Sequence, residues 1–344
     1  MTPLLQAEQV TKRFPGSGMR SAGMLALDTL SLAIGTERPS ITAVVGESGS
    51  GKTTLARILL GLIAPSTGRV LYRGEDVQAL SGARRRDFRR DVQAVFQDPY
   101  EVYNPFYRVD HVLTTPVRNF GLASSKAEGR RLIEEALRAV GLRPEEILGR
   151  YPHQLSGGQR QRIMVARAVL MKPKLIVADE PVSMVDASLR ATILGSLRKM
   201  NEEMGISIIY ITHDLATAYQ VSDSILVMYR AAVVEAGDVE RVVQAPQHPY
   251  TQLLISSIPQ VDTQRDWLDG ARETGGPAAS ADGCRFAARC PYAEAACRVA
   301  QPRLLRTEDH RAVACIRHGD APELDDLGKV LEARGAHQMQ SIGD

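Results

Sequence analysis

The sequence predicts an α/β fold in which a largely parallel sheet is covered by helices on both faces. Short apolar runs rich in β-branched residues alternate with helix-forming segments as far as Pro259. The expected strands are residues 41–45, 92–96, 175–178, 206–211 and 225–228. The expected helices include residues 52–61, 127–140 and 187–204. This order of elements requires helical crossovers between parallel strands.

Length and composition exclude several classes of protein. The chain has 344 residues, of which 44% are hydrophobic, so it can bury a sizeable core and is neither largely disordered nor a small disulfide scaffold. Its 42 Lys+Arg and 40 Asp+Glu leave a formal charge of +2, which argues against broad binding to nucleic-acid phosphates. Because it has no long apolar run and no signal peptide, we expect a cytosolic chain that a partner can bring to a membrane.

Composition also suggests how the chain is divided. We expect a first domain over residues 1–259, within which about 98–168 form a mainly helical subdomain broken by Pro and Gly. Residues 260–283 are polar and rich in Gly, Ala, Asp and Thr, which is typical of a linker. All four cysteines fall in a C-terminal extension over 284–318, and a polar tail follows over 319–344.

A glycine-rich turn after the first apolar strand carries the strongest motif. It matches G-x-x-x-x-G-K-[ST] and continues with a second threonine, and its residues are Gly46, Glu47, Ser48, Gly49, Ser50, Gly51, Lys52, Thr53 and Thr54. Glycines let backbone N–H groups surround phosphate oxygens, and the helix N-terminus adds positive potential. Lys52 can reach the β- and γ-phosphates, and the Thr53 hydroxyl can bind Mg²⁺. The alternative, a Gly/Ser loop that binds nothing, is disfavoured by the flanking strand and helix.

Two carboxylates end a later apolar strand. Asp179 can organise the Mg²⁺ shell, and Glu180 can polarise a water for attack on the γ-phosphate. Taken alone, such a pair is more often a helix cap or a solvated turn. The P-loop upstream favours the hydrolytic interpretation, so the sequence predicts an NTPase.

A third element precedes the acidic strand and opens a helix. Its residues are Ser156, Gly157, Gly158 and Gln159. A hydroxyl and exposed amides at a helix start form a second anion-binding N-terminus. One nucleotide cannot use two such ends of one subunit if they lie far apart, whereas a head-to-tail dimer sandwiches each nucleotide between two chains.

These ordered motifs resemble the ATP-binding cassette (ABC) family over about the first 260 residues. The resemblance implies a RecA-like P-loop NTPase core with an antiparallel β subdomain and a helical subdomain. It implies that Gln97 contacts Mg²⁺ and the attacking water, and that His213 contacts the γ-phosphate. The implied Mg²⁺ ligands are therefore Thr53, Gln97 and Asp179.

The same resemblance assigns two further residues. Asp186 is expected to communicate across the dimer, although Met184 and Val185 depart from the usual family form beside it. Phe14 is expected to stack on adenine, with a core phenylalanine as the alternative.

Among ABC ATPases, the transporter class fits this chain better than translation or repair factors. It carries one cassette, with no long coiled coil between Gln97 and Ser156. The resemblance implies a peripheral protein at the cytoplasmic membrane face, with a second ATPase subunit, identical or homologous, two integral membrane permeases and, indirectly, an extracytoplasmic solute-binding protein. Aromatic residues in 98–106 suit a permease docking surface, or alternatively a packed core.

The C-terminal part resembles one subfamily, the oligopeptide/dipeptide importers. The resemblance is carried by Gln247-His-Pro-Tyr-Thr-Gln-Leu-Leu254 and by Gly283-Cys-Arg-Phe-Ala-Ala-Arg-Cys290-Pro. Members of this subfamily import short peptides, and some import nickel or oligosaccharides. The expected function is thus an ATP-hydrolysing motor of such an importer. The alternative is a soluble ABC-type ATPase that acts on nucleic acid through a metal knuckle.

The four cysteines are gathered in one short C-terminal stretch. Cys284, Cys290, Cys297 and Cys315 lack the C-x2-C pair typical of zinc sites. Four thiolates without a compact pair suit a [4Fe–4S] cluster, and the resemblance implies the same occupant. Zinc, disulfides or free thiols remain alternatives, and a cytosolic location disfavours disulfides.

Overall fold

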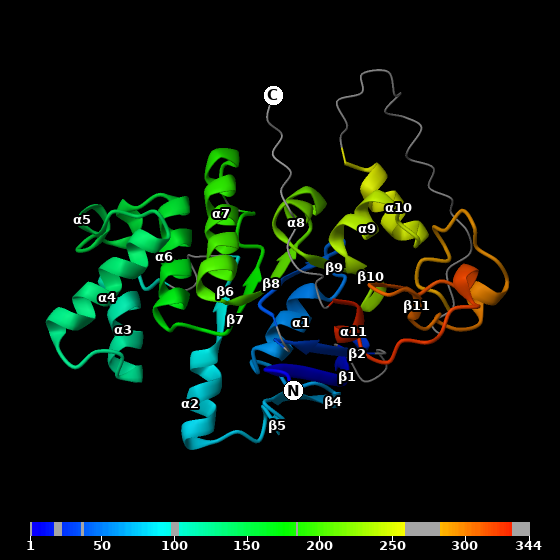
Figure 1. Cartoon of the computed structure of the whole chain (residues 1–344), viewed down its shortest axis with the longest axis horizontal. Coiled ribbons are helices and arrows are strands. Elements are labelled where there is room, and N and C mark those ends of the chain that lie inside the picture. The colour runs from blue at the N-terminus through cyan, green and yellow to red at the C-terminus, as the bar shows by residue number, and fades with distance from the viewer. Residues whose placement is uncertain are drawn as a thin grey trace, which may run out of the picture.

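The computed structural model describes residues 2–16, 23–35, 38–97, 103–183, 185–258 and 283–331. Some features expected from the sequence lie outside these ranges: residues 98–102, Met184, the linker at 260–282 and the tail after residue 331. Figure 1 labels the elements of the described part.

The main sheet of the described residues has the strand order β11-β12-β10-β9-β3-β8-β7-β6. Its strands are β3 (Ile41–Val45), β6 (Val92–Val95), β7 (Leu175–Asp179), β8 (Ser207–Thr212), β9 (Ser224–Tyr229), β10 (Ala232–Asp238), β11 (Leu305–Glu308) and β12 (Arg311–Val313). Strands β9, β3, β8, β7 and β6 pair in parallel, while β10, β12 and β11 extend the sheet in antiparallel pairing. The expected parallel core is confirmed, and the sheet as a whole is mixed.

A second, antiparallel sheet has the order β2-β1-β4-β5. Its strands are β1 (Leu5–Phe14), β2 (Met24–Ile34), β4 (Thr67–Tyr72) and β5 (Glu75–Asp76). Its residues alternate between buried and partly exposed along β2, which is the pattern of a sheet with one face on the core.

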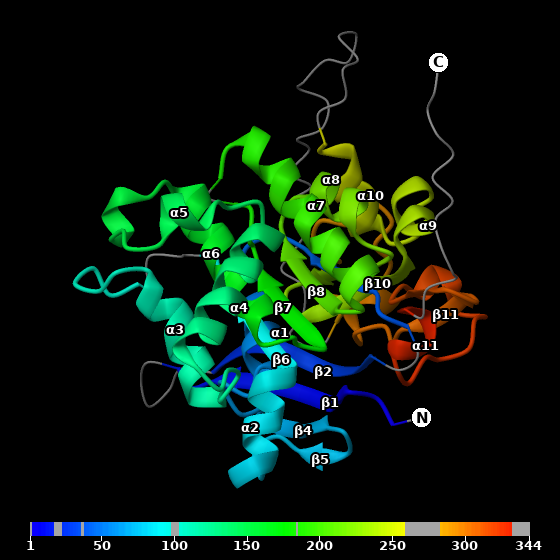
Figure 2. The same cartoon turned by 60° about the vertical axis from the view of Figure 1, so that its left-hand side comes forward.

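The helices of the described residues fall into two groups. Those around the main sheet are α1 (Lys52–Leu59), α2 (Gly82–Asp91), α7 (Ala187–Met204), α8 (Leu215–Val221), α9 (Val239–Gln244), α10 (Pro249–Ser256) and α11 (Gly328–Leu331). Those of the expected helical subdomain are α3 (Asp110–Phe120), α4 (Lys126–Ala139), α5 (Pro144–Ile147) and α6 (Gly157–Leu170). Figure 2 shows this second group together at one side of the molecule. No helix of the described residues is both long and apolar enough to cross a membrane.

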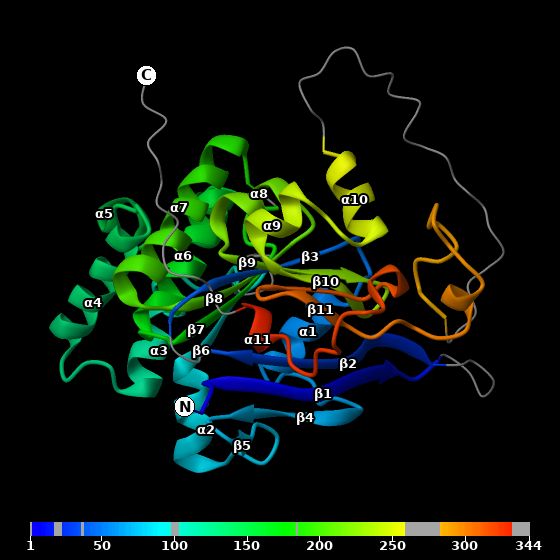
Figure 3. The same cartoon turned by 45° about the vertical axis from the view of Figure 1, so that its right-hand side comes forward.

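Two apolar cores lie on the two faces of the main sheet. Within β3, Ile41, Ala43 and Val45 belong to the core that includes the helical group, while Val44 belongs to the core shared with α1 and the antiparallel sheet. Figure 3 shows the resulting layers, with α7 to α10 above the main sheet and α1 between it and the antiparallel sheet. Burial on both faces explains why the central strands are continuous apolar runs.

The C-terminal segment differs from the separate extension that the sequence suggested. Strands β11 and β12 join the main sheet through β10, with Glu235 opposite Val313. Part of the expected polar tail also packs into the core, because Val330 and Leu331 of α11 are buried. The strands between Cys297 and Cys315, and α11 after them, are therefore part of the cassette fold.

A buried ion pair fixes this attachment. Arg311 of β12 and Glu235 of β10 are 3% and 0% exposed, and their closest charged atoms are 2.8 Å apart. The Glu235 carboxylate also accepts the backbone N–H groups of Gln247 and His248, each at 2.9 Å. Because each carboxylate oxygen has a partner, the desolvation cost of the buried charge is offset.

His248 caps the helix that follows. Its Nδ1 accepts the backbone N–H of Tyr250 at 3.0 Å, so the ring holds the first turn of α10. Burial, with a smaller contribution from His318, lowers the pKa of His248 to about 4. The folded protein therefore keeps this ring neutral.

We predict that protonation of His248 in the unfolded chain lowers the stability of the folded protein in acid. Its pKa falls from 6.5 in the unfolded chain to about 4 in the folded protein, so the unfolded state binds the proton more readily. The free energy of unfolding therefore decreases as the pH falls from 6.5 towards 4, by about 2 kcal/mol between pH 7 and pH 5. His248→Asn keeps a capping acceptor without this proton site. Urea unfolding at both pH values should show a smaller acid loss in the variant, and an equal loss would contradict the assignment.

Candidate nucleotide site at the carboxyl edge of the main sheet

The strand register brings three predicted site residues to one edge. Val45 of β3 lies opposite Thr212 of β8, and Asp179 of β7 lies opposite Ile211 of β8. The residues that follow these strand ends are Gly46, Glu180 and His213. Since parallel strands end at the same edge, the P-loop, the acidic pair and the histidine converge where ligands bind in open α/β sheets.

The P-loop turn requires glycine immediately before α1. Gly51 has a φ of +106°, and a Cβ at this position would lie 2.2 Å from the Ala26 carbonyl oxygen. A larger residue would therefore clash with the backbone of β2 as well as strain its own. Gly51 directs the chain into α1 at Lys52, so the loop's N–H groups and the helix N-terminus face the same space.

Lys52 is buried inside the loop. Its Nζ donates to the Gly46 carbonyl at 2.7 Å and to the Glu47 carbonyl at 2.9 Å. Burial lowers the pKa of Lys52, and the negative charges of Glu180, Asp179 and Glu47 oppose that shift. The ammonium group thus lies within the field of the acidic pair and can meet a phosphate at this edge.

Asp179 and Thr53 form a candidate ligand pair for Mg²⁺. Burial raises the pKa of Asp179, and a hydrogen bond from the Thr53 side chain opposes the shift. The Oδ1 atom of Asp179 is buried without a hydrogen-bond partner. A carboxylate oxygen and a hydroxyl are the ligand types that Mg²⁺ prefers, so these residues fit the ion. Gln97 is exposed just after β6, and its place among the ligands stays a prediction.

Glu180 and His213 lie against each other. The Nδ1 atom of His213 is 3.1 Å from Oε1 of Glu180. Glu180 has a φ of +47°, a left-handed conformation that is costly for a residue with a side chain. Its N–H donates to the Ile211 carbonyl at 2.9 Å, which holds the strained residue at the edge of the sheet. The sequence placed both residues in one catalytic site, and the structure puts them in contact.

The residues of the second predicted anion-binding element, 156–159, lie at the start of α6. Ser156 is the N-cap of α6, and its Oγ accepts a hydrogen bond from the Gln159 N–H at 3.2 Å. In return, the Ser156 N–H donates to Gln159 Oε1 at 2.9 Å. A Cβ on Gly158 would lie 2.5 Å from Leu189 Cδ1, so this glycine allows close packing. In Figures 1 and 2, α6 lies in the helical group while α1 is at the centre of the molecule. The structure does not bring the α6 helix beside α1, the helix that follows the P-loop.

The remaining predicted nucleotide contacts are Asp186 and Phe14, which lie outside the apolar cores of the described residues. Asp186 is exposed at the N-cap of α7. Phe14 is half-buried at the end of β1, with Lys12 Nζ 5.2 Å from its ring centre. Neither apolar core of the described residues includes Phe14, which disfavours the alternative of a core phenylalanine.

The aromatic segment after Gln97 divides into two kinds of residue. Tyr103 is buried and its hydroxyl donates to the Arg160 carbonyl at 2.9 Å, so it has a packing role. Phe106 is 86% exposed and Tyr107 is 51% exposed. Among the described aromatics of 98–106, Phe106 is thus the exposed one, and its place in a docking surface stays a prediction.

The four cysteines lie around one small cavity. Cys284, Cys290, Cys297 and Cys315 all line a space of about 20 Å³ beside His248 and Phe286. All four thiols are free, and burial raises the pKa of Cys284, Cys290 and Cys315. Within the described ranges, no three His, Cys, Asp or Glu side chains are spaced to hold a metal ion. The cysteines are gathered as the sequence suggested, without a ligand set for a single ion.

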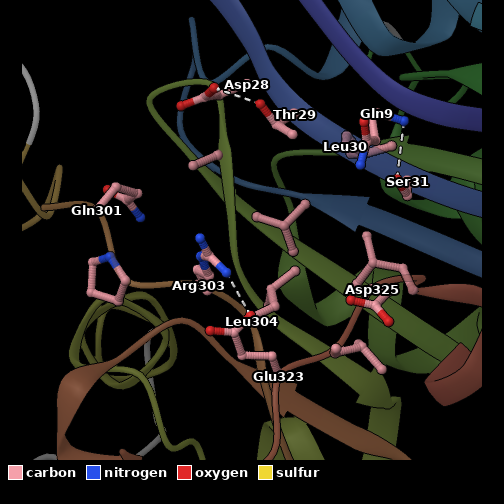
Figure 4. Close-up of a pocket in the computed structure, with 15 residues that line it drawn as sticks. Gln9, Asp28, Thr29, Leu30, Ser31, Gln301, Arg303, Leu304, Glu323 and Asp325 are labelled. Carbon is pink, nitrogen blue, oxygen red and sulfur yellow. Dashed lines mark hydrogen bonds and ion pairs between the residues drawn. The ribbon is translucent and has the colours of Figure 1, made fainter. Parts of the chain in front are cut away.

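A larger cavity lies away from the P-loop. It has a volume of about 530 Å³ between β2, β10 and the C-terminal segment, and Figure 4 shows its lining, which includes Asp28, Arg303 and Glu323. No P-loop residue lines it. It is therefore separate from the candidate nucleotide site.

Sequence reasoning missed two residues that contact the P-loop from the C-terminal part of the chain. The Tyr250 hydroxyl accepts the Glu47 N–H at 3.0 Å, and Arg289 pairs with the Glu47 carboxylate at 2.9 Å. Both lie in the segments that carry the subfamily resemblance. No local pattern indicates such contacts, because more than 200 residues separate the partners.

Comparisons with known proteins identify the family of the chain. The profile of the family described as "ABC transporter" matches residues 27–183, and that described as "Oligopeptide/dipeptide transporter, C-terminal region" matches residues 234–297. The "Probable peptide ABC transporter ATP-binding protein y4tS" of Sinorhizobium fredii is 41% identical over 325 residues, covering 93% of this chain and 90% of that protein. The "Di/tripeptide transport ATP-binding protein DppF" of Pseudomonas aeruginosa is 39% identical over 320 residues, covering 92% and 98%.

Solved structures are similar over the cassette. The ATP-binding cassette MJ0796, in a dimeric post-hydrolysis state bound to ADP and Pi, has a TM-score of 0.60 and 29% identity, covering 68% of this chain and 98% of that one. The cbiO1 protein of Clostridium perfringens, part of an ABC transporter complex, has a TM-score of 0.60 and 28% identity, covering 71% and 92%. The nucleic-acid alternative receives no support from these similarities.

Proposed function

Because the chain belongs to the ATP-binding proteins of the ABC transporter family, with the C-terminal region of oligopeptide/dipeptide transporters, we propose that it drives the import of short peptides. The relatives named for peptide or di/tripeptide transport cover nearly the whole chain. The convergence of the P-loop, Asp179, Glu180 and His213 at one sheet edge carries the ATP-hydrolysing part of the proposal. The named relatives carry the substrate class.

The geometry supports a division of labour at this edge. Lys52 and the loop N–H groups bind the β- and γ-phosphates. Glu180 orients the attacking water, and His213, in contact with it, steadies the γ-phosphate. Thr53 and Asp179, with Gln97, hold Mg²⁺, which neutralises charge on the phosphates when bound. The left-handed backbone conformation of Glu180 orients its carboxylate for the attacking water before ATP binds.

A second cassette completes each site. The capped start of α6, with Ser156, Gly157, Gly158 and Gln159, is suited to the ATP held by an opposite chain in a head-to-tail dimer, identical or homologous. Asp186, which is exposed at the start of α7, is suited to contact the opposite chain and so to couple the two sites. Support comes from the dimeric structure of the similar cassette MJ0796.

Membrane partners supply the transport path. We place the chain at the cytoplasmic face of the membrane, where two integral permeases dock on it and receive peptide from an extracytoplasmic solute-binding protein. The exposed Phe106 and Tyr107 support a docking surface just beyond Gln97, because large exposed aromatics side by side mark interaction sites.

We also propose that the four cysteines bind a [4Fe–4S] cluster. The donor set fits, since four free thiols line one cavity and such clusters take Cys₄ ligation. Zinc is less suitable because the cysteines lack the C-x2-C pair typical of its sites. The described side chains hold no preformed metal-ligand set for either occupant. The cavity of about 20 Å³ is narrow, so loading requires the thiols to move apart and to lose their protons. The cluster would have a structural role in this segment.

The motor assignment is tested by Glu180→Gln in the assembled transporter. We expect ATP hydrolysis and uptake of radiolabelled dialanine and trialanine to fall at least about 100-fold, while ATP binding stays within about two-fold, because only the water-orienting carboxylate is lost. Glu240→Gln, at an exposed position of α9, serves as the control with normal uptake. Hydrolysis at the wild-type rate in Glu180→Gln would contradict the role of Glu180. If the wild-type transporter hydrolysed ATP regardless of peptide and took up neither peptide, the proposed substrate class would be contradicted.

The cluster is tested by metal analysis of anaerobically purified protein. We expect about four iron and four sulfide per chain, with broad visible absorption that Cys297→Ser abolishes. Protein without iron would contradict the cluster, and one zinc per chain would favour the alternative occupant.

A further inference from the structure

Glu47 of the P-loop is held by residues outside the loop. Its backbone N–H donates to the Tyr250 hydroxyl at 3.0 Å. Its carboxylate oxygens accept from Arg289 Nη1 at 2.9 and 3.2 Å. Tyr250 belongs to α10, and Arg289 immediately precedes Cys290 in the cysteine-bearing segment. The P-loop is thus fastened at one residue to two distant parts of the chain.

A cluster of three aromatic residues, Tyr229, Tyr250 and Phe286, contacts Arg289 and holds it beside Glu47. Tyr229, at the end of β9, has its ring centre 4.5 Å from that of Tyr250 and 5.3 Å from that of Phe286. The Arg289 guanidinium lies 5.8 Å from the Tyr229 ring centre and 5.7 Å from that of Phe286, and it donates to the Tyr229 hydroxyl at 3.4 Å. Cation–π contacts with two rings and the hydrogen bond to Tyr229 hold the guanidinium beside Glu47.

The charge of Glu47 matters for a phosphate ligand. The backbone carbonyl of Glu47 accepts a hydrogen bond from Lys52 Nζ at 2.9 Å. Burial lowers the pKa of Lys52, and the negative charge of the Glu47 side chain opposes that shift. Because the Glu47 side chain adds a negative charge to the phosphate-binding loop, it repels a triphosphate unless a cation compensates it. Arg289 supplies that cation.

We propose that Arg289 is a positioning residue of the ATP site, which neutralises and anchors Glu47 so that the cysteine-bearing segment becomes part of the nucleotide site. The inference rests on ATP binding by the P-loop and is independent of the transported substrate and of the cluster. Both side chains are more than 40% exposed, at 43% and 44%. Exposed ion pairs contribute little to folding, so the effect should be seen in ATP affinity rather than in stability.

The test is ATP binding by the full-length chain, measured by calorimetry at low ionic strength. We expect Arg289→Ala to weaken ATP binding about five-fold, and Arg289→Lys to weaken it less. Glu47→Gln should bind ATP at least as tightly as wild type. The double variant Glu47→Gln/Arg289→Ala should return to within about two-fold of wild type, because the charge that needed compensation is gone. Arg303→Ala, which removes an exposed pair with Glu323, is the matched control with unchanged affinity.

Rescue separates positioning from a general structural role. Affinity of Arg289→Ala within about two-fold of wild type would overturn the proposal. So would a loss that Glu47→Gln does not rescue, or a parallel loss of unfolding free energy in both the single and the double variant. Failure of wild-type protein to bind ATP would instead count against the ATPase assignment itself.

Discussion

The parallel pairing of β3, β8 and β7 is the constraint on which the site depends. It fixes where three strands end, with Val45 opposite Thr212 and Asp179 opposite Ile211. The residues that follow these ends carry the chemistry, and a slip in register would separate the P-loop from the acidic pair. Burial on both faces holds the register, since two apolar cores pack against alternate residues of β3. The strained backbone of Glu180 is sustained by the same packing.

Much of this site can be predicted from the sequence because its signals are local. The P-loop, the acidic pair and the Ser156 motif are each short runs with a known mechanism, and each follows or opens an element that periodicity identifies. His213 is recognisable only by its place after a strand, because a lone histidine carries no signal of its own. Its contact with Glu180 needs the register of β7 and β8, which only the structure supplies.

The C-terminal part is where sequence reasoning reaches less far. Strand β11 is mostly polar and β12 has only three residues, so the sequence alone does not identify either as a strand until β10 is seen beside β12. The buried pair of Arg311 and Glu235 holds them there, and charged residues ordinarily indicate surface. Likewise, the anchors of Glu47 come from residues more than 200 positions away. These long-range contacts make the cysteine-bearing segment continuous with the ATPase core rather than an appendage.

A structure of the Glu180→Gln variant with ATP and Mg²⁺ tests the central claim most directly, namely that three strand ends hold one nucleotide. The account predicts the γ-phosphate against Lys52 and His213. It also predicts Mg²⁺ at about 2.1 Å from the Thr53 hydroxyl, beside Asp179. Nucleotide bound away from residues 46–54, for example in the cavity lined by Asp28 and Arg303, would contradict it.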